Sequence, residues 1–368
     1  MPELADIVRR YGGEYIEKFG ANMLPSHRRA LSDILHCRTE VLGGHVYRCD
    51  QCGQEAYAYH SCRNRSCPKC HGPSTEAWLN KRRAELMPVE YFHLVFTLPA
   101  VLREIVRRYQ KTLYGVLMKS AAKALMKLAA DPKYVGGQLG ILAVLHTWSR
   151  LLDFHPHVHC LVPGGGISAD QEWRPARKGY LVPVGALSKI FRGIFMQMAA
   201  AKLPDVAIPK TVWDQPWVVH CKPAIAGPQK VLDYLGRYVH RVALPNSRIV
   251  SIDDGRVCFR YQHCDSREWK TLTLPAMEFI RRFLQHVLPK GVHKVRYYGF
   301  LAPSNRARLR RLQIALAESV PGKLLPAVPD DPAPIAFVRI GTGQRCPHCQ
   351  TGHLVRIGSI PRCERAPP

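Results

Sequence analysis

Hydrophobic and polar residues follow two different periods along this chain, and together they predict a mixture of helices and strands. Apolar residues at every third or fourth position predict helices over residues 1–36, 74–86, 101–128, 187–203, 228–242, 277–287 and 306–319. Short runs rich in β-branched and aromatic residues predict strands over 91–98, 141–148, 154–160, 213–221 and 269–274, and Asp253-Asp254-Gly255 predicts a hairpin over 249–261. Strands separated by long helical stretches are typical of an α+β fold.

The charge balance indicates the kind of partner. Lys and Arg total 53 against 28 Asp and Glu, which gives a formal net charge of +25. An excess of this size predicts binding to a polyanion, for which nucleic acid is the usual candidate and an anionic membrane surface is the alternative. Because no apolar run approaches the length of a membrane span and no signal peptide opens the chain, we expect a cytoplasmic protein with no membrane partner.

The elements divide the 368 residues into four predicted parts. Residues 1–90, with helices and a cysteine cluster, are predicted to form a zinc-binding and DNA-binding domain. Residues 91–245 form the central α+β domain, and residues 246–320 form an extension with a β-hairpin and helices. Residues 321–368 begin as a proline-rich linker and end in a tail that carries further cysteines.

Two Cys-x-x-Cys pairs near the N-terminus have the spacing of zinc ligands. Cys49 and Cys52 form the first pair, Cys67 and Cys70 the second, and fourteen residues lie between the pairs. Each pair turns two thiolates toward one point, so two pairs complete a tetrahedral site. A reducing compartment disfavours disulfides between these cysteines. We therefore predict a structural zinc ion bound by these four residues.

Other cysteines and histidines are candidate ligands for further zinc ions. Those of a second N-terminal site are Cys37, His45 and Cys62, and those of a site in the tail are Cys346, Cys349, His353 and Cys363. The alternatives are buried free thiols near the N-terminus and incidental thiols in the tail.

Basic residues around these motifs are candidate DNA contacts. The set comprises Arg63, Arg65, Lys69, Arg82 and Arg83 beside the cysteines, and Lys230, Arg237 and Arg241 in the predicted helix 228–242. Cations placed in this way bind phosphates. The alternative is a solvated basic surface.

The segment Phe154–Cys160 carries the most informative motif. His157 and His159 are two residues apart on a predicted strand, so both side chains point to the same face and can bind one metal ion. We expect His146, from the preceding strand, to be the third ligand, with His155 and Asp153 as alternatives. Imidazoles suit manganese, zinc and other transition metals, and magnesium is acceptable if water and phosphate complete its shell.

The predicted helix 228–242 places Tyr234 and Tyr238 one turn apart on one face. A phenol is a weak nucleophile at neutral pH because its pKa is about 10. A metal ion on the phosphate and nearby cations would overcome that limit, and the product would be a phosphotyrosine ester. A core or surface role is the alternative for these tyrosines. Gly164-Gly165-Gly166 after the histidine strand would allow a nucleic-acid backbone to approach, or would form a flexible turn.

Taken together, these residues resemble transposases of rolling-circle insertion sequences of the type numbered ninety-one, members of the HUH endonuclease superfamily. The motifs similar to the zinc domain of that family are Cys37-Arg38-Thr39, Leu42-Gly43-Gly44-His45, Ser61-Cys62-Arg63-Asn64-Arg65 and Cys67-Pro68-Lys69-Cys70. His146-Thr147-Trp148 with His155-Pro156-His157-Val158-His159 is similar to its metal motif, and Tyr234-Leu235-Gly236-Arg237-Tyr238 to its two-tyrosine motif. Ser247-Arg248-Ile249, 278–283, 286–291 and Tyr298-Gly299-Phe300 are also similar.

The resemblance implies an α+β fold, in which an antiparallel-sheet HUH endonuclease domain of five strands, with helical insertions, follows a zinc-binding module. It implies nicking and rejoining of single DNA strands through 5′-phosphotyrosine links to Tyr234 and Tyr238, with His157 and His159 as metal ligands. The cofactors would be structural Zn²⁺ and catalytic Mn²⁺ or Mg²⁺. The partners would be single- and double-stranded DNA at the ends of an insertion sequence and at its target. A non-enzymatic zinc-dependent DNA-binding protein (a degenerate transposase) and a related replication initiator or relaxase are the alternatives.

Overall fold

A five-stranded sheet forms the centre of the protein. The computed structural model describes residues 2–70, 72–224, 232, 243–263, 266–318 and 340–363. The strands lie in the order β12-β4-β5-β3-β8, and every neighbouring pair is antiparallel. Their bounds are β3 Tyr91–Thr97, β4 Gly140–Trp148, β5 Phe154–Pro163, β8 Val219–Pro223 and β12 Val295–Gly299. The expected α+β fold with an antiparallel sheet is confirmed.

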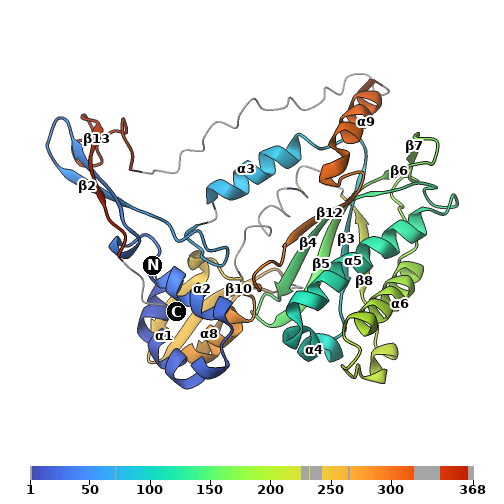
Figure 1. Cartoon of the computed structure of the whole chain (residues 1–368), viewed down its shortest axis with the longest axis horizontal. Coiled ribbons are helices and arrows are strands. Elements are labelled where there is room, and N and C mark those ends of the chain that lie inside the picture. Colours follow the sequence, from blue (N-terminus) through green and yellow to red (C-terminus); the bar gives the residue numbers. More distant parts are fainter. Residues whose placement is uncertain are drawn as a thin grey trace.

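Three helices cover one face of this sheet: α4 (Arg103–Arg108), α5 (Gln110–Ala129) and α6 (Val184–Lys202) (Figure 1). Alternate side chains of β3, among them Phe92, Leu94 and Phe96, point into the core that they share with these helices. The alternation leaves the opposite face to the other set of side chains, which includes the histidines.

Two edge strands depart from the sequence prediction. The strand expected over 213–221 begins only at Val219, because the 3-10 helix η4 (Lys210–Trp213) and Pro216 occupy the preceding residues. The strand β12 was not predicted, since charged and aromatic residues replace the apolar run of a buried strand. It pairs with β4 along its whole length, from Val295 opposite Val144 to Gly299 opposite Gly140.

A second core joins elements from both ends of the chain. It contains the N-terminal helices α1 (Leu4–Phe19) and α2 (Pro25–Leu35), the sheet β11-β10-β9 and the helix α8 (Ala276–Leu284). Of these strands, β9 spans Ile249–Asp253, β10 spans Arg256–Gln262 and β11 spans Trp269–Pro275. The predicted boundaries at residues 90 and 245 therefore separate elements that pack together.

A small third sheet, in the order β13-β1-β2, combines β1 (Gly44–Cys49) and β2 (Glu55–Tyr59) with β13 (Leu354–Ile360). Figure 1 shows β13, from the C-terminal tail, beside the N-terminal hairpin. The remaining elements are η1 Gly20–Asn22, η2 Glu40–Leu42, α3 Gly72–Arg83, η3 Ala100–Leu102, β6 Gly165–Ile167, β7 Trp173–Pro175, η5 Asn246–Arg248, η6 Pro303–Asn305 and α9 Arg306–Glu318. Among the described helices, none is long and apolar enough to cross a membrane.

The glycines after the histidine strand serve packing. Gly165 and Gly166 are buried in the β6–β7 pair. A Cβ on Gly165 would lie 2.3 Å from the ring of Trp173, and one on Gly166 would lie 2.9 Å from the backbone of Gly137. Their small size is needed inside the protein, so the expectation of an open approach for a nucleic-acid backbone was wrong at these residues.

Substitution of Gly299 tests how much the β12–β4 pair contributes to stability. Its φ is +61°, and a Cβ would lie 1.7 Å from the carbonyl oxygen of Leu139, whereas Gly291 has a φ of +82° with open space around it. Gly299→Ala should destabilise the protein by more than about 4 kcal/mol, against about 1–2 kcal/mol of backbone strain for Gly291→Ala. Urea denaturation of both variants measures the difference, and equal midpoints would refute the account of this edge.

Candidate functional site

The β4–β5 pair brings three imidazoles together. His146 lies directly opposite His157, and His159 lies opposite Val144, so all three side chains share the face of the sheet not covered by α4–α6. One ligand atom from each lies within 4.8 Å of the others. Nitrogen ligands around one ion are roughly 3–4 Å apart, so small ring rotations suffice for common coordination. His146, the predicted third ligand, therefore lies beside His157 and His159.

A bulge and a tight loop fix this register. The pairing shifts between His146 and Trp148, where His155 and Pro156 together oppose Thr147. Proline lacks an amide donor and is tolerated at such a bulge, which re-aims the neighbouring side chains. Within the loop, the Ser149 hydroxyl accepts hydrogen bonds from the amides of residues 151 and 153, at 3.2 and 3.1 Å.

Helix α8 and the residues after it hold the loop from outside. Arg282 donates to the carbonyl of Leu151 and forms an ion pair with Asp153 at 2.8 Å. The buried His286 contacts the carbonyl of Leu152 through Nε2, at 3.1 Å, and Thr147 through Nδ1. Neither Arg282 nor His286 was identified as a site residue from the sequence, because their role depends on the packing of α8 against the loop.

Burial keeps the three imidazoles neutral. It lowers the pKa of His157 to about 4 and, with repulsion from neighbouring imidazoles, lowers the pKa of His146 and of His159 well below the ordinary value. A histidine must be neutral to bind a metal ion. The donor set is therefore in its ligating form at neutral pH.

Hydrogen bonds select the ligand atoms. Nδ1 of His157 lies 2.7 Å from the carbonyl oxygen of His155 and so carries the proton, which assigns Nε2 as its ligand atom. Nδ1 of His159 lies 2.8 Å from Nε2 of His93, whose ring stacks on it. The sequence indicated only an ordinary core or surface role for His93. Its alternation on β3 with Phe92 and Leu94, which face the core, is the signal that places it on the histidine face.

The two alternative ligands have other partners. His155 lies 3.1 Å from the guanidinium of Arg103, and Asp153 pairs with Arg282. The three-imidazole set fits a transition metal such as Mn²⁺ and accepts Mg²⁺ if water and phosphate oxygens complete the shell.

Tyr234, Tyr238, Lys230, Arg237 and Arg241 lie outside the described residues. Leu232, two residues before Tyr234, is described: it is helical and buried against Leu142 and Leu161. Leu161 lies two residues beyond His159 on β5, so Leu232 packs on the histidine face of the sheet.

The cysteines near the N-terminus group differently from the prediction. Cys67 and Cys70 cluster with Cys37 and Cys62, and the Sγ of Cys70 lies 3.4 and 3.5 Å from the Sγ atoms of these two. Cys49 and Cys52 lie at the tip of the β1–β2 hairpin, whose strands of about five residues span roughly 17 Å. The single Cys49–Cys52–Cys67–Cys70 site was therefore wrong, because the hairpin carries one pair away from the other.

Ionisation differs within the first cluster. Contacts between the thiols lower the pKa of Cys37 to about 7 and lower the pKa of Cys70, while they raise the pKa of Cys62 and of Cys67. Four adjacent thiols cannot all ionise without a cation among them. The cluster thus fits a structural Zn²⁺ ion bound by four thiolates.

The predicted tail site also has a different composition. Cys346 and Cys349 cluster with Cys49 and Cys52. The remaining candidates lie in neither cluster: the ring of His45 packs on His60, His353 bonds through its backbone to Asp50, and Cys363 is exposed. They were predicted as ligands because they lie near the Cys-x-x-Cys pairs in the sequence and, for His45, because of the resemblance to the zinc domain.

Some of the basic residues predicted to contact DNA form ion pairs or hydrogen bonds with other residues of the protein. Arg82 is only 8% exposed, pairs with Glu85 and lies 4.9 Å from the ring centre of Tyr297, so the structure contradicts its assignment to phosphate contact. Arg65 donates to the carbonyls of Leu288, Pro289 and Val292. Lys69 pairs with Glu3 and Arg83 with Glu76. Arg63 is exposed, and DNA contact by these four residues stays a prediction.

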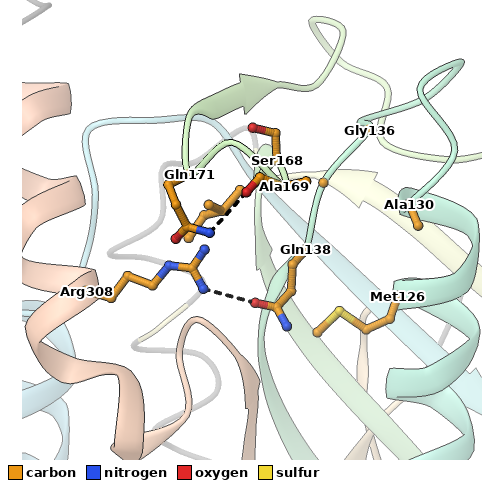
Figure 2. A pocket seen from close by; sticks show the side chains of 10 residues that line it. Met126, Ala130, Gly136, Gln138, Ser168, Ala169, Gln171 and Arg308 are labelled. Carbon is orange, nitrogen blue, oxygen red and sulfur yellow. Dashed lines mark hydrogen bonds between the residues drawn. The ribbon is translucent and has the colours of Figure 1, made fainter.

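A separate open cavity of about 610 Å³ lies beside the start of β4, whereas His146 lies near the end of that strand. Arg308 donates to Gln138 across it (Figure 2). Its described lining contains no histidine, cysteine or carboxylate, so it lacks the side chains that usually bind a catalytic metal ion.

Two known protein families match this chain, one over the N-terminal cysteine cluster and one over the histidine cluster. Residues 7–98 match the family described as "Transposase zinc-binding domain", and residues 140–308, which include the histidines, match the one described as "Putative transposase". No solved structure matches.

Two relatives extend the agreement over most of the chain. The "Putative transposase y4qJ" of Sinorhizobium fredii (strain NBRC 101917 / NGR234) is 41% identical over 97% of this chain and 95% of its own length. The "Transposase for insertion sequence element IS801" of Pseudomonas savastanoi pv. phaseolicola is 29% identical over 79% of this chain and 74% of its own. The chain belongs to the transposase family with the IS91-type zinc-binding domain.

His93 should orient His159 for metal binding. Loss of a residue that holds a ligand costs about 10–100-fold in affinity, so His93→Phe should weaken Mn²⁺ binding by that factor. His220→Phe is the matched control, because His220 is exposed on the adjacent β8. Isothermal titration calorimetry with Mn²⁺ measures both, and an unchanged affinity for His93→Phe would refute this role.

The lowered pKa values predict metal binding that tolerates mild acid. Imidazoles with a pKa near 6.5 would be mostly protonated at pH 6, and three such ligands would lose about 50-fold in affinity between pH 7.5 and pH 6. With the pKa of His157 at about 4 and those of His146 and His159 lowered as well, the loss should stay below about threefold. Titrations with Mn²⁺ at the two pH values decide between these outcomes.

Proposed function

We propose that this transposase nicks and rejoins single DNA strands through phosphotyrosine links, in the rolling-circle manner implied by its motifs. The observation that carries the proposal is the buried cluster of His146, His157 and His159 on one face of the sheet. Three neutral imidazoles held by hydrogen bonds and by the loop are suited to a divalent ion.

Such an ion, Mn²⁺ or Mg²⁺, would polarise the scissile phosphate and help to orient it. The histidines' own part is to hold their ring positions: His157 through the carbonyl of His155, and His159 through His93. Because the rings stay neutral, they add no charge that would need a counter-ion in the absence of DNA.

Tyr234 and Tyr238 are the proposed nucleophiles. A phenolic oxygen would attack phosphorus, the 3′ oxygen of the neighbouring nucleotide would leave with a proton, and the tyrosine would keep the 5′ phosphate as an ester. The position of Leu232 supports this assignment only through the path of the chain, which reaches the histidine face two residues before Tyr234.

Positive charge near the cluster supports DNA as the substrate. Lys294 lies 4.6 Å above the ring of Trp148, which stacks on His146, and Arg103 lies beside His155. Together with the net charge of +25, these cations favour a polyanion at this face.

A covalent adduct tests the proposal. With Mn²⁺ and single-stranded oligonucleotides from the element ends, the wild type should form a protein–DNA adduct that survives boiling in detergent. The double variant Tyr234→Phe/Tyr238→Phe should form none, while Tyr180→Phe, which changes an exposed tyrosine elsewhere, should match the wild type. Each single tyrosine variant then identifies the first nucleophile.

The same assay separates the alternatives. A wild-type protein that binds these DNAs but forms no adduct with any end would be a non-enzymatic DNA-binding protein. An adduct that persists in the double variant would reject these tyrosines and assign the chemistry to another residue.

A further inference from the structure

Two cysteine pairs from opposite ends of the chain meet at the tip of the β1–β2 hairpin. Cys49 and Cys52 lie at the turn, and Cys346 and Cys349 lie just before β13, about 300 residues further along the chain. We propose that these four residues bind a second structural Zn²⁺ ion, which fastens the C-terminal segment 340–363 to the N-terminal hairpin. The proposal does not depend on the strand-transfer chemistry.

The sulfur positions match a tetrahedral metal site. The Sγ atoms of Cys49 and Cys349 are 3.7 Å apart, as are those of Cys52 and Cys346. With Zn–S bonds of about 2.3 Å, the edges of a tetrahedral site are about 3.8 Å long. A disulfide would require about 2.05 Å, so these pairs are spaced as ligands of one ion.

Backbone amides surround the sulfurs in the same way in both pairs. The Sγ of Cys49 accepts from the amide of Gln51, and the Sγ of Cys346 accepts from the amide of His348, each at 3.4 Å. The Sγ of Cys349 accepts from Gly352 at 3.3 Å. Donors aimed at sulfur favour the thiolate over the thiol. Each pair is therefore shaped as a metal-binding turn before any ion is considered.

The two turns are also built to approach each other. A Cβ on Gly352 would lie 2.5 Å from the Sγ of Cys49 and 2.7 Å from the side chain of Asp50, so only glycine fits there. The Asp50 carboxylate accepts from the amide of His353 at 2.7 Å, and the Asp50 amide donates to the carbonyl of His353. These contacts join the turns directly at the cluster.

The sheet at this place has too little core to explain the contact without a metal ion. The buried residues of its hydrophobic cluster are Tyr47, Cys49, Cys346 and Leu354, so half of that cluster consists of ligand cysteines. Several other side chains of β13, such as Val355 and Ile357, are largely exposed. Small modules with so little apolar burial usually depend on a metal ion or disulfides.

The site is separate from the N-terminal cluster of Cys37, Cys62, Cys67 and Cys70, because none of the eight cysteines is shared. The cysteines of the wild type should therefore bind two zinc ions per chain. Loss of the second ion should release β13 from β1 while the first cluster keeps its metal.

Zinc content of the full-length protein tests the proposal. In a His157→Ala/His159→Ala background, which removes the histidine cluster as a third metal site, Cys346→Ser/Cys349→Ser should lower the zinc measured by mass spectrometry from two ions to one per chain, and Cys363→Ser, the matched control with an exposed cysteine, should retain two. Cobalt substitution gives a second readout: the thiolate-to-cobalt absorption should fall by about half in the double variant only.

Hydrogen exchange shows whether the ion fastens the tail. Amides of β13 should exchange at least tenfold faster in the double variant, while those of α1 and α2 should be unchanged. Two zinc ions retained in the double variant would overturn the proposal. So would a wild type that holds one ion, or one whose mass after purification without reductant shows disulfides at these cysteines.

Discussion

The register between β4 and β5 is the constraint on which the rest of the site depends. His146 faces His157, and a slip of one residue would turn one strand's imidazoles to the opposite face. The bulge at Pro156, the Ser149 hydroxyl and the contacts of Arg282 and His286 all act on this short hairpin. They fix the pairing at the end of the sheet where the imidazoles lie.

The contacts that support the β4–β5 loop also connect the N-terminal cysteine cluster to the histidine site. Helix α8 supports the β4–β5 loop on one side and shares a core with α1 and α2 on the other, and that core also contains Cys37 and Cys67. Arg65, between the cysteines of the first cluster, donates to three carbonyls after α8. The N-terminal domain of this transposase is thus part of the support for the histidines, in addition to any role in holding DNA.

How much the sequence predicts depends on whether local patterns determine the contacts. The alternation of His157 and His159 on a strand is local, so their shared face follows from period two, and His146 follows from a short hairpin. The grouping of cysteines depends on where a hairpin ends, and no local spacing shows that Cys49 meets Cys349. The roles of Arg282 and the strand β12 likewise depend on packing between distant segments, which a single sequence does not display.

The position of a bound ion tests the central claim most directly. Crystals grown with Mn²⁺ should show one anomalous-scattering peak within about 2.3 Å of the ligand nitrogens of His146, His157 and His159, with Nε2 as the ligand atom of the last two. An ion held elsewhere in a protein that still cleaves DNA, or cleavage by protein with no ion at these histidines, would contradict the account.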